Sequence, residues 1–237
     1  MKLNWLQTLF RHIYPQDCLL CGAEANPKTR FCNACYSALP FNHHACPRCA
    51  LPLPPATPAG IRCGACLNKR LPYHACVTAL RYEPPSNQLI AQLKFRHKLH
   101  LTLPLAQLII DRLGELKNPP DLLLPVPLHQ QRMRERGFNQ ALELGRVVSQ
   151  NYRIPLDSRL VKRTRNTKAQ SDLNEKRRRS NLRHAFRVYG SLKGTRVAII
   201  DDVITTGSTI NEMSKALKRS GASEITVWAV ARSVIGR

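Results

Sequence analysis

Two adjacent carboxylates stand directly before a loop rich in hydroxyl groups, in the stretch RVAIIDDVITTGSTINEMSKAL, residues 196–217. The glycine and small side chains of this loop allow backbone N–H groups to point at a phosphate, at the start of the helix expected next. Asp201 and Asp202 would repel a bare phosphate, so they fit a group beside it, either ribose hydroxyls or a divalent cation. This interpretation, a phosphoribosyl site, uses Asp201, Asp202, Thr205, Thr206, Gly207, Ser208 and Thr209.

Other nucleotide-binding loops give similar spacing, including a Rossmann-type turn and an acidic receiver site. The glycine patterns G-x-G-x-x-G and G-x-x-x-x-G-K-[ST] are absent from the sequence, which disfavours the nucleotide alternatives. The stretch itself resembles the ribose-phosphate-binding motif of type I phosphoribosyltransferases.

Eight of the nine cysteines form four Cys-x-x-Cys pairs near the start of the chain. Two such pairs complete a tetrahedral Cys₄ zinc site with no open coordination position, so we expect two structural zinc ions. Sequential pairing of the turns is the simplest arrangement, and a cross-braced arrangement has the same spacing. Cys76 is left over, and we expect it to be a buried, inert thiol. The predicted ligands are Cys18, Cys21, Cys32, Cys35, Cys46, Cys49, Cys63 and Cys66.

The chain is strongly basic, with 37 Lys and Arg against 15 Asp and Glu among 237 residues. Such an excess favours polyanionic partners such as nucleic acid, nucleotides or an anionic membrane face. The alternative is a solvated basic surface, because charge alone specifies no partner. No apolar run is long enough for a membrane span, and the first residues lack the pattern of a signal peptide. We therefore expect a cytoplasmic protein.

Apolar runs alternate with helical periodicity after the cysteine-rich segment, which predicts an α/β fold with a parallel sheet covered on both faces. Ligands of such sheets lie at the carboxyl ends of the strands, where the acidic pair stands. The expected strands are 77–84, 122–126, 196–202 and 224–232. The expected helices are 86–116, broken near 95–98, then 136–152 and 208–221.

Three further stretches carry a more specific resemblance: QLKFRHK (92–98), PVPLHQQRMRERGFNQA (125–141) and KRTRNTKAQSDLNEKRRRSNLRHAF (162–186). Together with IIDDVITTGST and the paired cysteines, they resemble the ComF family over nearly the whole chain. The resemblance implies an N-terminal helix and double zinc ribbon in residues 1–76 and a type I phosphoribosyltransferase-like domain in 77–237. It also implies a role in natural competence and in the use of incoming single-stranded DNA.

Basic residues in these stretches are candidate phosphate contacts. By analogy with the superfamily, the loop after the strand at 122–126 meets the pyrophosphate of phosphoribosyl pyrophosphate (PRPP), and arginine suits this because its planar fork bonds phosphate oxygens in pairs. Lys94 and Arg96 flank Phe95, which either stacks on a base or belongs to the core. The segment from residue 162 either closes over a substrate or follows a DNA backbone. The candidates are Arg132, Arg134, Arg136, Lys94, Arg96, Arg165 and Lys168.

Three functions remain open at this point. The first is a competence-type protein that handles single-stranded DNA and binds PRPP with Mg²⁺, with DNA-uptake or helicase proteins as partners of the zinc ribbons. The second is a metabolic phosphoribosyltransferase that transfers phosphoribosyl to a nucleobase-like acceptor and releases pyrophosphate. The third is a nucleotide-sensing regulator. The sequence shows no clear base-recognising hood, which disfavours the second function.

Overall fold

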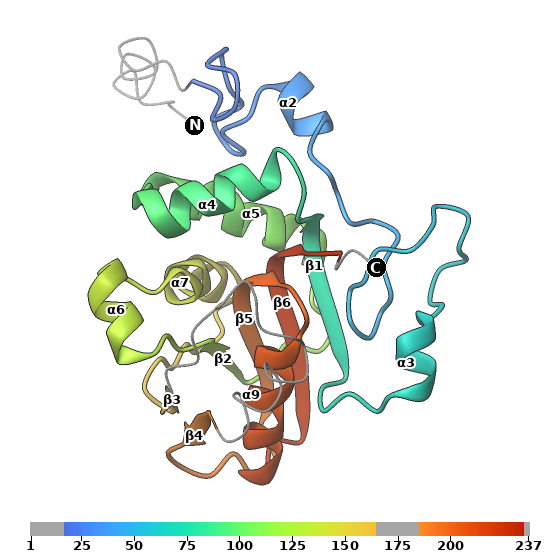
Figure 1. Cartoon of the computed structure of the whole chain (residues 1–237), viewed down its shortest axis with the longest axis vertical. Coiled ribbons are helices and arrows are strands. Elements are labelled where there is room, and N and C mark those ends of the chain that lie inside the picture. Colours follow the sequence, from blue (N-terminus) through green and yellow to red (C-terminus); the bar gives the residue numbers. More distant parts are fainter. Residues whose placement is uncertain (1–16, 165–184, 235–237) are drawn as a thin grey trace, which may run out of the picture.

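The centre of the protein is a four-stranded parallel sheet, in a computed structural model that describes residues 17–164 and 185–234 (Figure 1). Its order is β1 (Ala75–Arg81), β6 (Glu224–Arg232), β5 (Arg196–Ile204) and β2 (Leu122–Pro125). All three neighbouring pairs run parallel. The middle strands are almost wholly buried, as their continuous apolar runs require of a sheet covered on both faces. The predicted α/β fold with a parallel sheet is confirmed.

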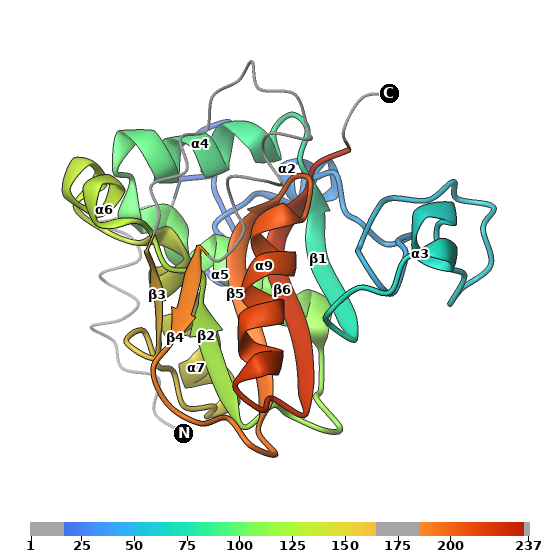
Figure 2. The same ribbon diagram turned by 60° about the horizontal axis from the view of Figure 1, so that its bottom comes forward.

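Helices cover the two faces of the sheet (Figure 2). On one face, α7 (Gln140–Tyr152) packs against β5 and β2, and α5 (Thr102–Leu113) packs against β1 and β6. Ala198 and Ile200 of β5 belong to the apolar cluster on this face. On the other face, α9 (Ser208–Arg219) packs against the intervening residue Ile199. Each face therefore has its own apolar cluster, and the carboxyl end of β5 lies between them.

The expected helix at 86–116 is broken, as predicted, near residues 95–98. The first part is α4 (Ser86–Arg96), which ends at His97 in the left-handed conformation with φ of 54°. A single 3-10 turn, η1 (Leu99–Leu101), then leads into α5. The break allows α4 to cross the carboxyl ends of the strands, so that its last turn reaches the acidic pair.

Three elements of the sheet domain were not expected from the sequence. The segment after β2 is a short helix, α6 (Gln130–Arg136), where we predicted a loop. The His129 imidazole accepts a hydrogen bond from the Gln131 N–H at its start, and Gly137 ends it with φ of 71°. Two short strands, β3 (Val161–Arg163) and β4 (Phe186–Val188), pair antiparallel.

The two cysteine-rich segments lie at different places on the sheet domain (Figure 1). The first ribbon, residues 18–35 with α2 (Asn33–Ser37), packs on the α5 side, and the fully buried Phe31 shares the apolar cluster of α4 and α5. The second ribbon, residues 46–66 with α3 (Gly64–Asn68), lies beside β1 and has a small cluster of its own. The boundary at residue 76 stays a prediction, and the predicted N-terminal helix lies outside the described residues.

Within residues 17–164 and 185–234, no helix combines the length and the apolar character that crossing a membrane needs.

Candidate functional site

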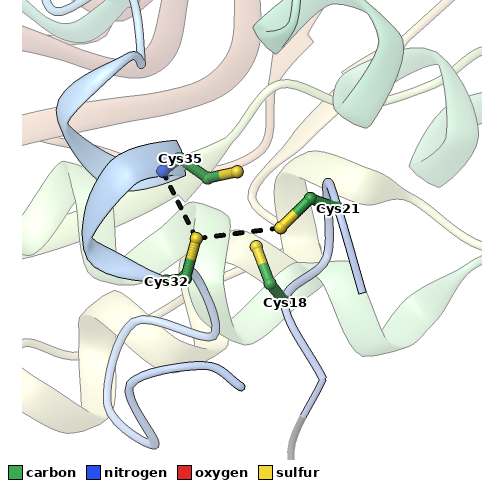
Figure 3. Close-up of side chains that lie close together, drawn as sticks. All are labelled: Cys18, Cys21, Cys32 and Cys35. Carbon is green, nitrogen blue, oxygen red and sulfur yellow. Dashed lines mark hydrogen bonds between the residues drawn. The ribbon is translucent and has the colours of Figure 1, made fainter. Parts of the chain in front are cut away.

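The eight paired cysteines form two compact tetrads. Cys18, Cys21, Cys32 and Cys35 point their sulfurs toward one another (Figure 3), and the other tetrad is Cys46, Cys49, Cys63 and Cys66. Within each tetrad the sulfur atoms lie within 4.8 Å of one another. A tetrahedral zinc ion with Zn–S bonds of about 2.3 Å requires S–S separations of about 3.8 Å, so both tetrads fit zinc. The turns pair sequentially, and four thiolates around each ion indicate structural sites.

Backbone donors support the tetrads. The Cys35 N–H donates to Cys32 Sγ over 3.4 Å, and the Cys63 N–H donates to Cys46 Sγ over 3.3 Å. Such donors offset the negative charge that thiolates bring to a metal site. The remaining thiol, Cys76, lies in β1 with 4% of its surface exposed, and burial raises its pKa. It is therefore the buried, inert thiol that the sequence predicts.

Asp201 and Asp202 lie near the carboxyl end of β5, and both are buried. Asp201 is 9% exposed and Asp202 is 2% exposed. The Asp202 N–H donates to Asp201 Oδ1 over 2.9 Å, and the Val203 N–H donates to Asp202 Oδ1 over 2.7 Å. Burial, with the neighbouring charge of Asp202, raises the pKa of Asp201 to about 8. Burial thus favours the protonated form of Asp201 over its charged form.

Lysine and arginine side chains gather around this pair. Lys94 Nζ lies 2.7 Å from Asp202 Oδ2. Burial lowers the pKa of Arg136, and Asp202 opposes that shift while Arg132 adds to it. Burial also lowers the pKa of Arg163, again with Arg132 lowering it and Asp201 raising it. Arg136 thus interacts electrostatically with Asp202 and Arg163 with Asp201, while Arg132 interacts with both of these arginines. Together with the Lys94 ammonium, this positive charge favours an anionic ligand.

Because α6 is a helix, its three arginines lie on different sides and differ in burial. Arg132 and Arg136 are four residues apart and share a side of the helix, where both are partly buried. Arg134 is exposed, and so is Arg96 at the end of α4. Of the predicted phosphate-contacting residues, Lys94 and Arg136 therefore interact with the acidic pair, whereas Arg134 and Arg96 are exposed. Arg165 and Lys168 lie outside the described residues, whereas Arg163 was missed because β3 has too short an apolar pattern to be recognised.

The phosphate loop, residues 205–209, leads directly into α9. Gly207 caps the helix with φ of 76°, a conformation that favours glycine. Thr206 Oγ1 lies 2.8 Å from Ser208 Oγ and accepts a hydrogen bond from the Ser208 N–H. The Ser208 N–H is thus engaged by Thr206. The N-cap residue Gly207 brings no side chain, so the N–H groups that follow Ser208 in the first turn of α9 are available to an anion.

Arg232, at the end of β6, was not recognised from the sequence as a functional residue. It is 7% exposed. Its guanidinium donates to the carbonyls of Cys49 at 3.1 Å, of Ile204 at 2.9 Å, and of Thr205. Arg232 therefore ties the second ribbon to the phosphate loop. Its only sequence signal is a cation at the end of an otherwise apolar strand.

Two exposed aromatic rings lie beside cations. Phe95 is 68% exposed, so the alternative that placed it in the core is wrong. The Arg136 guanidinium carbon lies 5.3 Å from its ring centroid. Tyr189 is 46% exposed, and Lys162 Nζ lies 5.0 Å from its ring. Rings in this setting can stack on bases while the cations contact phosphates.

Two parts of this chain match known domain families. Residues 9–67 match the double zinc ribbon domain, and residues 139–235 match the phosphoribosyl transferase domain. The DNA utilization protein YhgH of Escherichia coli K12 is 36% identical over 208 residues, which cover 86% of this chain and 90% of that protein. The chain belongs to the ComF family. The resemblance drawn from the sequence is thereby confirmed.

Two further proteins with similarity to this ComF-family chain are a curated relative and a solved structure. Competence protein F of Haemophilus influenzae is 38% identical over 179 residues, covering 72% of this chain and 78% of that protein. Among solved structures, the purine phosphoribosyltransferase of Pyrococcus horikoshii is 22% identical, with a TM-score of 0.31. That match covers 52% of this chain and 66% of the other.

Proposed function

We propose that this chain is a competence-type, cytoplasmic DNA-handling protein that binds single-stranded DNA and PRPP. The curated relatives are a DNA utilization protein and a competence protein, and both match most of the chain. The observation that carries the proposal is the contact of Lys94 Nζ with Asp202 at 2.7 Å near the phosphate loop. The electrostatic interactions of Arg136 with Asp202 and of Arg163 with Asp201 add to it.

Each part of PRPP has a complementary group at this site. The phosphate loop and the start of α9 bind the 5′-phosphate. Asp201 and Asp202 accept hydrogen bonds from the ribose hydroxyls. Arg132 and Arg136 neutralise the pyrophosphate, and Mg²⁺ is held between pyrophosphate and carboxylate oxygens, the hard ligands that it prefers.

Single-stranded DNA fits the surface beside this site. Phe95 supplies a stacking ring, and Arg136 and the neighbouring cations contact the backbone. Because only 6% of residues are aromatic and the net charge is +22, backbone contacts dominate and base specificity is low. Arg136 serves both ligands, so PRPP and DNA influence each other's binding.

The experiment that tests the PRPP site is calorimetric titration of PRPP with Mg²⁺ into the double variant Asp201→Asn, Asp202→Asn. We expect binding to be lost while the variant keeps its circular dichroism spectrum. Asp121→Asn, an exposed carboxylate paired with Arg196, is the matched control and should bind normally. Binding retained in the double variant would refute the assignment of the acidic pair.

The metabolic phosphoribosyltransferase has one observation in its favour: a cavity adjoins the phosphate loop. In such an enzyme the residues named above supply positioning and charge neutralisation more than covalent chemistry. Pyrophosphate release from PRPP in the presence of a panel of nucleobases measures this activity directly. Turnover with one base, absent in the Asp201→Asn, Asp202→Asn variant, would establish the enzyme.

A further inference from the structure

A cavity of about 530 Å³ lies between the second ribbon and the phosphate loop. One wall comes from the second ribbon and the chain that follows it, with Cys66 and Ala65 among its residues. The opposite wall comes from Gly207, Ser208 and the first turns of α9. Its volume is within the range of about 300–1,000 Å³ that is usual for small-molecule sites.

The cavity has an apolar part next to the second ribbon. Leu51, Leu71, Pro72 and Tyr73 line it there. Tyr73 is 3% exposed, and Pro72 has no side-chain freedom to lose, so these residues present preformed surfaces. Such surfaces suit a planar, apolar ring.

The lining also contains four cationic side chains. Lys69 and Arg70 come from the chain after the second ribbon, Lys215 comes from α9, and Arg232 comes from β6. Glu212 is the one carboxylate in the lining, and Lys215 Nζ pairs with it at 2.6 Å. A zinc ion with four thiolates is itself anionic, which these cations offset. The positive charge that remains, together with the phosphate loop, favours an anion.

The second ribbon and the phosphate loop are held at a defined distance. The Arg232 guanidinium bonds the Cys49 carbonyl on one side and the Ile204 carbonyl on the other. The Arg48 guanidinium donates to the His74 carbonyl at 2.6 Å and to the Leu71 carbonyl at 3.2 Å, which fixes the segment that carries the apolar lining. The cavity is therefore a consequence of how the zinc-bound ribbon is attached to the sheet.

From this lining we infer that the cavity binds a 5′-mononucleotide, with its phosphate at the phosphate loop and its base against the second ribbon. The inference rests on the phosphate loop of the proposed function, and it assigns to the ribbon the role of base-binding wall. Since both ligands place a phosphate on residues 205–209, PRPP and the mononucleotide exclude each other.

The test is calorimetric titration of thymidine 5′-monophosphate into the zinc-loaded full chain, beside ribose 5-phosphate and thymidine. We expect the mononucleotide to bind about tenfold or more tightly than either half, and PRPP to displace it. Ala65→Trp fills the cavity from α3, so mononucleotide affinity should fall about tenfold while PRPP affinity stays unchanged. Leu67→Trp is the matched control, because Leu67 is 69% exposed and lies outside the lining.

A second variant keeps the test decisive if Ala65→Trp fails to fold. Lys69→Glu with Arg70→Glu reverses two exposed cations of the lining and should weaken the mononucleotide similarly. Arg112→Glu with Lys117→Glu makes the same charge change on and just beyond α5 and should have little effect. Equal affinity for ribose 5-phosphate and the mononucleotide, or no effect of the lining variants, overturns the inference while PRPP still binds. If the unmodified chain does not bind PRPP, the proposed function is overturned as well.

Discussion

Lys94 Nζ lies 2.7 Å from Asp202 Oδ2, which joins the last turn of α4 to the carboxyl end of β5. Both side chains are largely withdrawn from solvent, with 20% of Lys94 and 3% of Asp202 exposed. Burial alone would lower the pKa of Lys94, but Asp202 raises it and keeps the ammonium charged. In the protein without ligand, this ammonium neutralises the carboxylate that we assign to the ribose side of PRPP.

Lys94→Ala should lower the free energy of unfolding by about 3 kcal/mol, because it leaves Asp202 buried without its cation. Lys98→Ala, which removes an exposed lysine four residues later, should change it by less than about 0.5 kcal/mol. Denaturant unfolding measures both values. Adding Asp202→Asn to Lys94→Ala should restore most of the loss, and strictly additive effects would contradict the pairing.

The free energy of unfolding should depend on pH through the titration of Asp201. Its pKa rises from an ordinary value of 3.8 to about 8 in the folded protein, chiefly through burial. Between these values the folded chain holds a proton that the unfolded chain has released, so the free energy of unfolding falls as pH rises from about 4 to about 8. Above about pH 8 this contribution levels off.

Asp201→Asn should remove that slope. Its melting temperature should exceed that of the unmodified chain by more near pH 8 than near pH 4, where Asp201 is neutral in the folded chain, and each kcal/mol gained corresponds to about 2–4 °C. Asp121→Asn is the control: hydrogen bonds from Arg196 lower the pKa of Asp121, so the pH dependence of its contribution lies below about pH 4 and the effect of this variant should be the same at both pH values. Equal gains at both pH values would refute the raised pKa of Asp201.

Phe95→Ala should weaken binding of a single-stranded oligonucleotide by about 1–3 kcal/mol, the usual loss for one stacked base. PRPP affinity should change less, because Phe95 contacts Arg136, whose guanidinium carbon lies 5.3 Å from its ring, and not the acidic pair. Leu67→Ala removes a side chain of similar exposure on α3 and serves as the control. Equal DNA affinity of the two variants, measured by fluorescence anisotropy, would contradict the stacking role.

Removal of zinc should affect the two ribbons differently. Cys32→Ser opens the first tetrad, and since Phe31 belongs to the cluster of α4 and α5, it should lower the melting temperature of the whole sheet. Cys63→Ser opens the second tetrad and should weaken PRPP binding through the link from Cys49 to Arg232, with the sheet still folded. Cys76→Ala should keep two zinc ions per chain. Equal losses of melting temperature in both zinc-site variants would contradict this division.

The sequence predicts the features that are encoded locally. Continuous apolar runs specify the strands of a buried parallel sheet, and Cys-x-x-Cys spacing specifies two metal sites. In α6, by contrast, Met133 is the one apolar residue of QQRMRER, so the segment has no helical spacing of apolar residues from which a helix could be predicted. The roles of Lys94 and Arg232 depend on contacts between distant segments, which a single sequence does not reveal.

The central claim, that one surface binds both DNA and PRPP, is tested most directly by anisotropy of a labelled single-stranded oligonucleotide across a salt series, with and without PRPP and Mg²⁺. We predict tight binding whose logarithm falls steeply and linearly with the logarithm of salt concentration, and whose strength changes when PRPP is added. Absence of DNA binding at low salt, with PRPP still bound, would contradict the account and favour the metabolic enzyme.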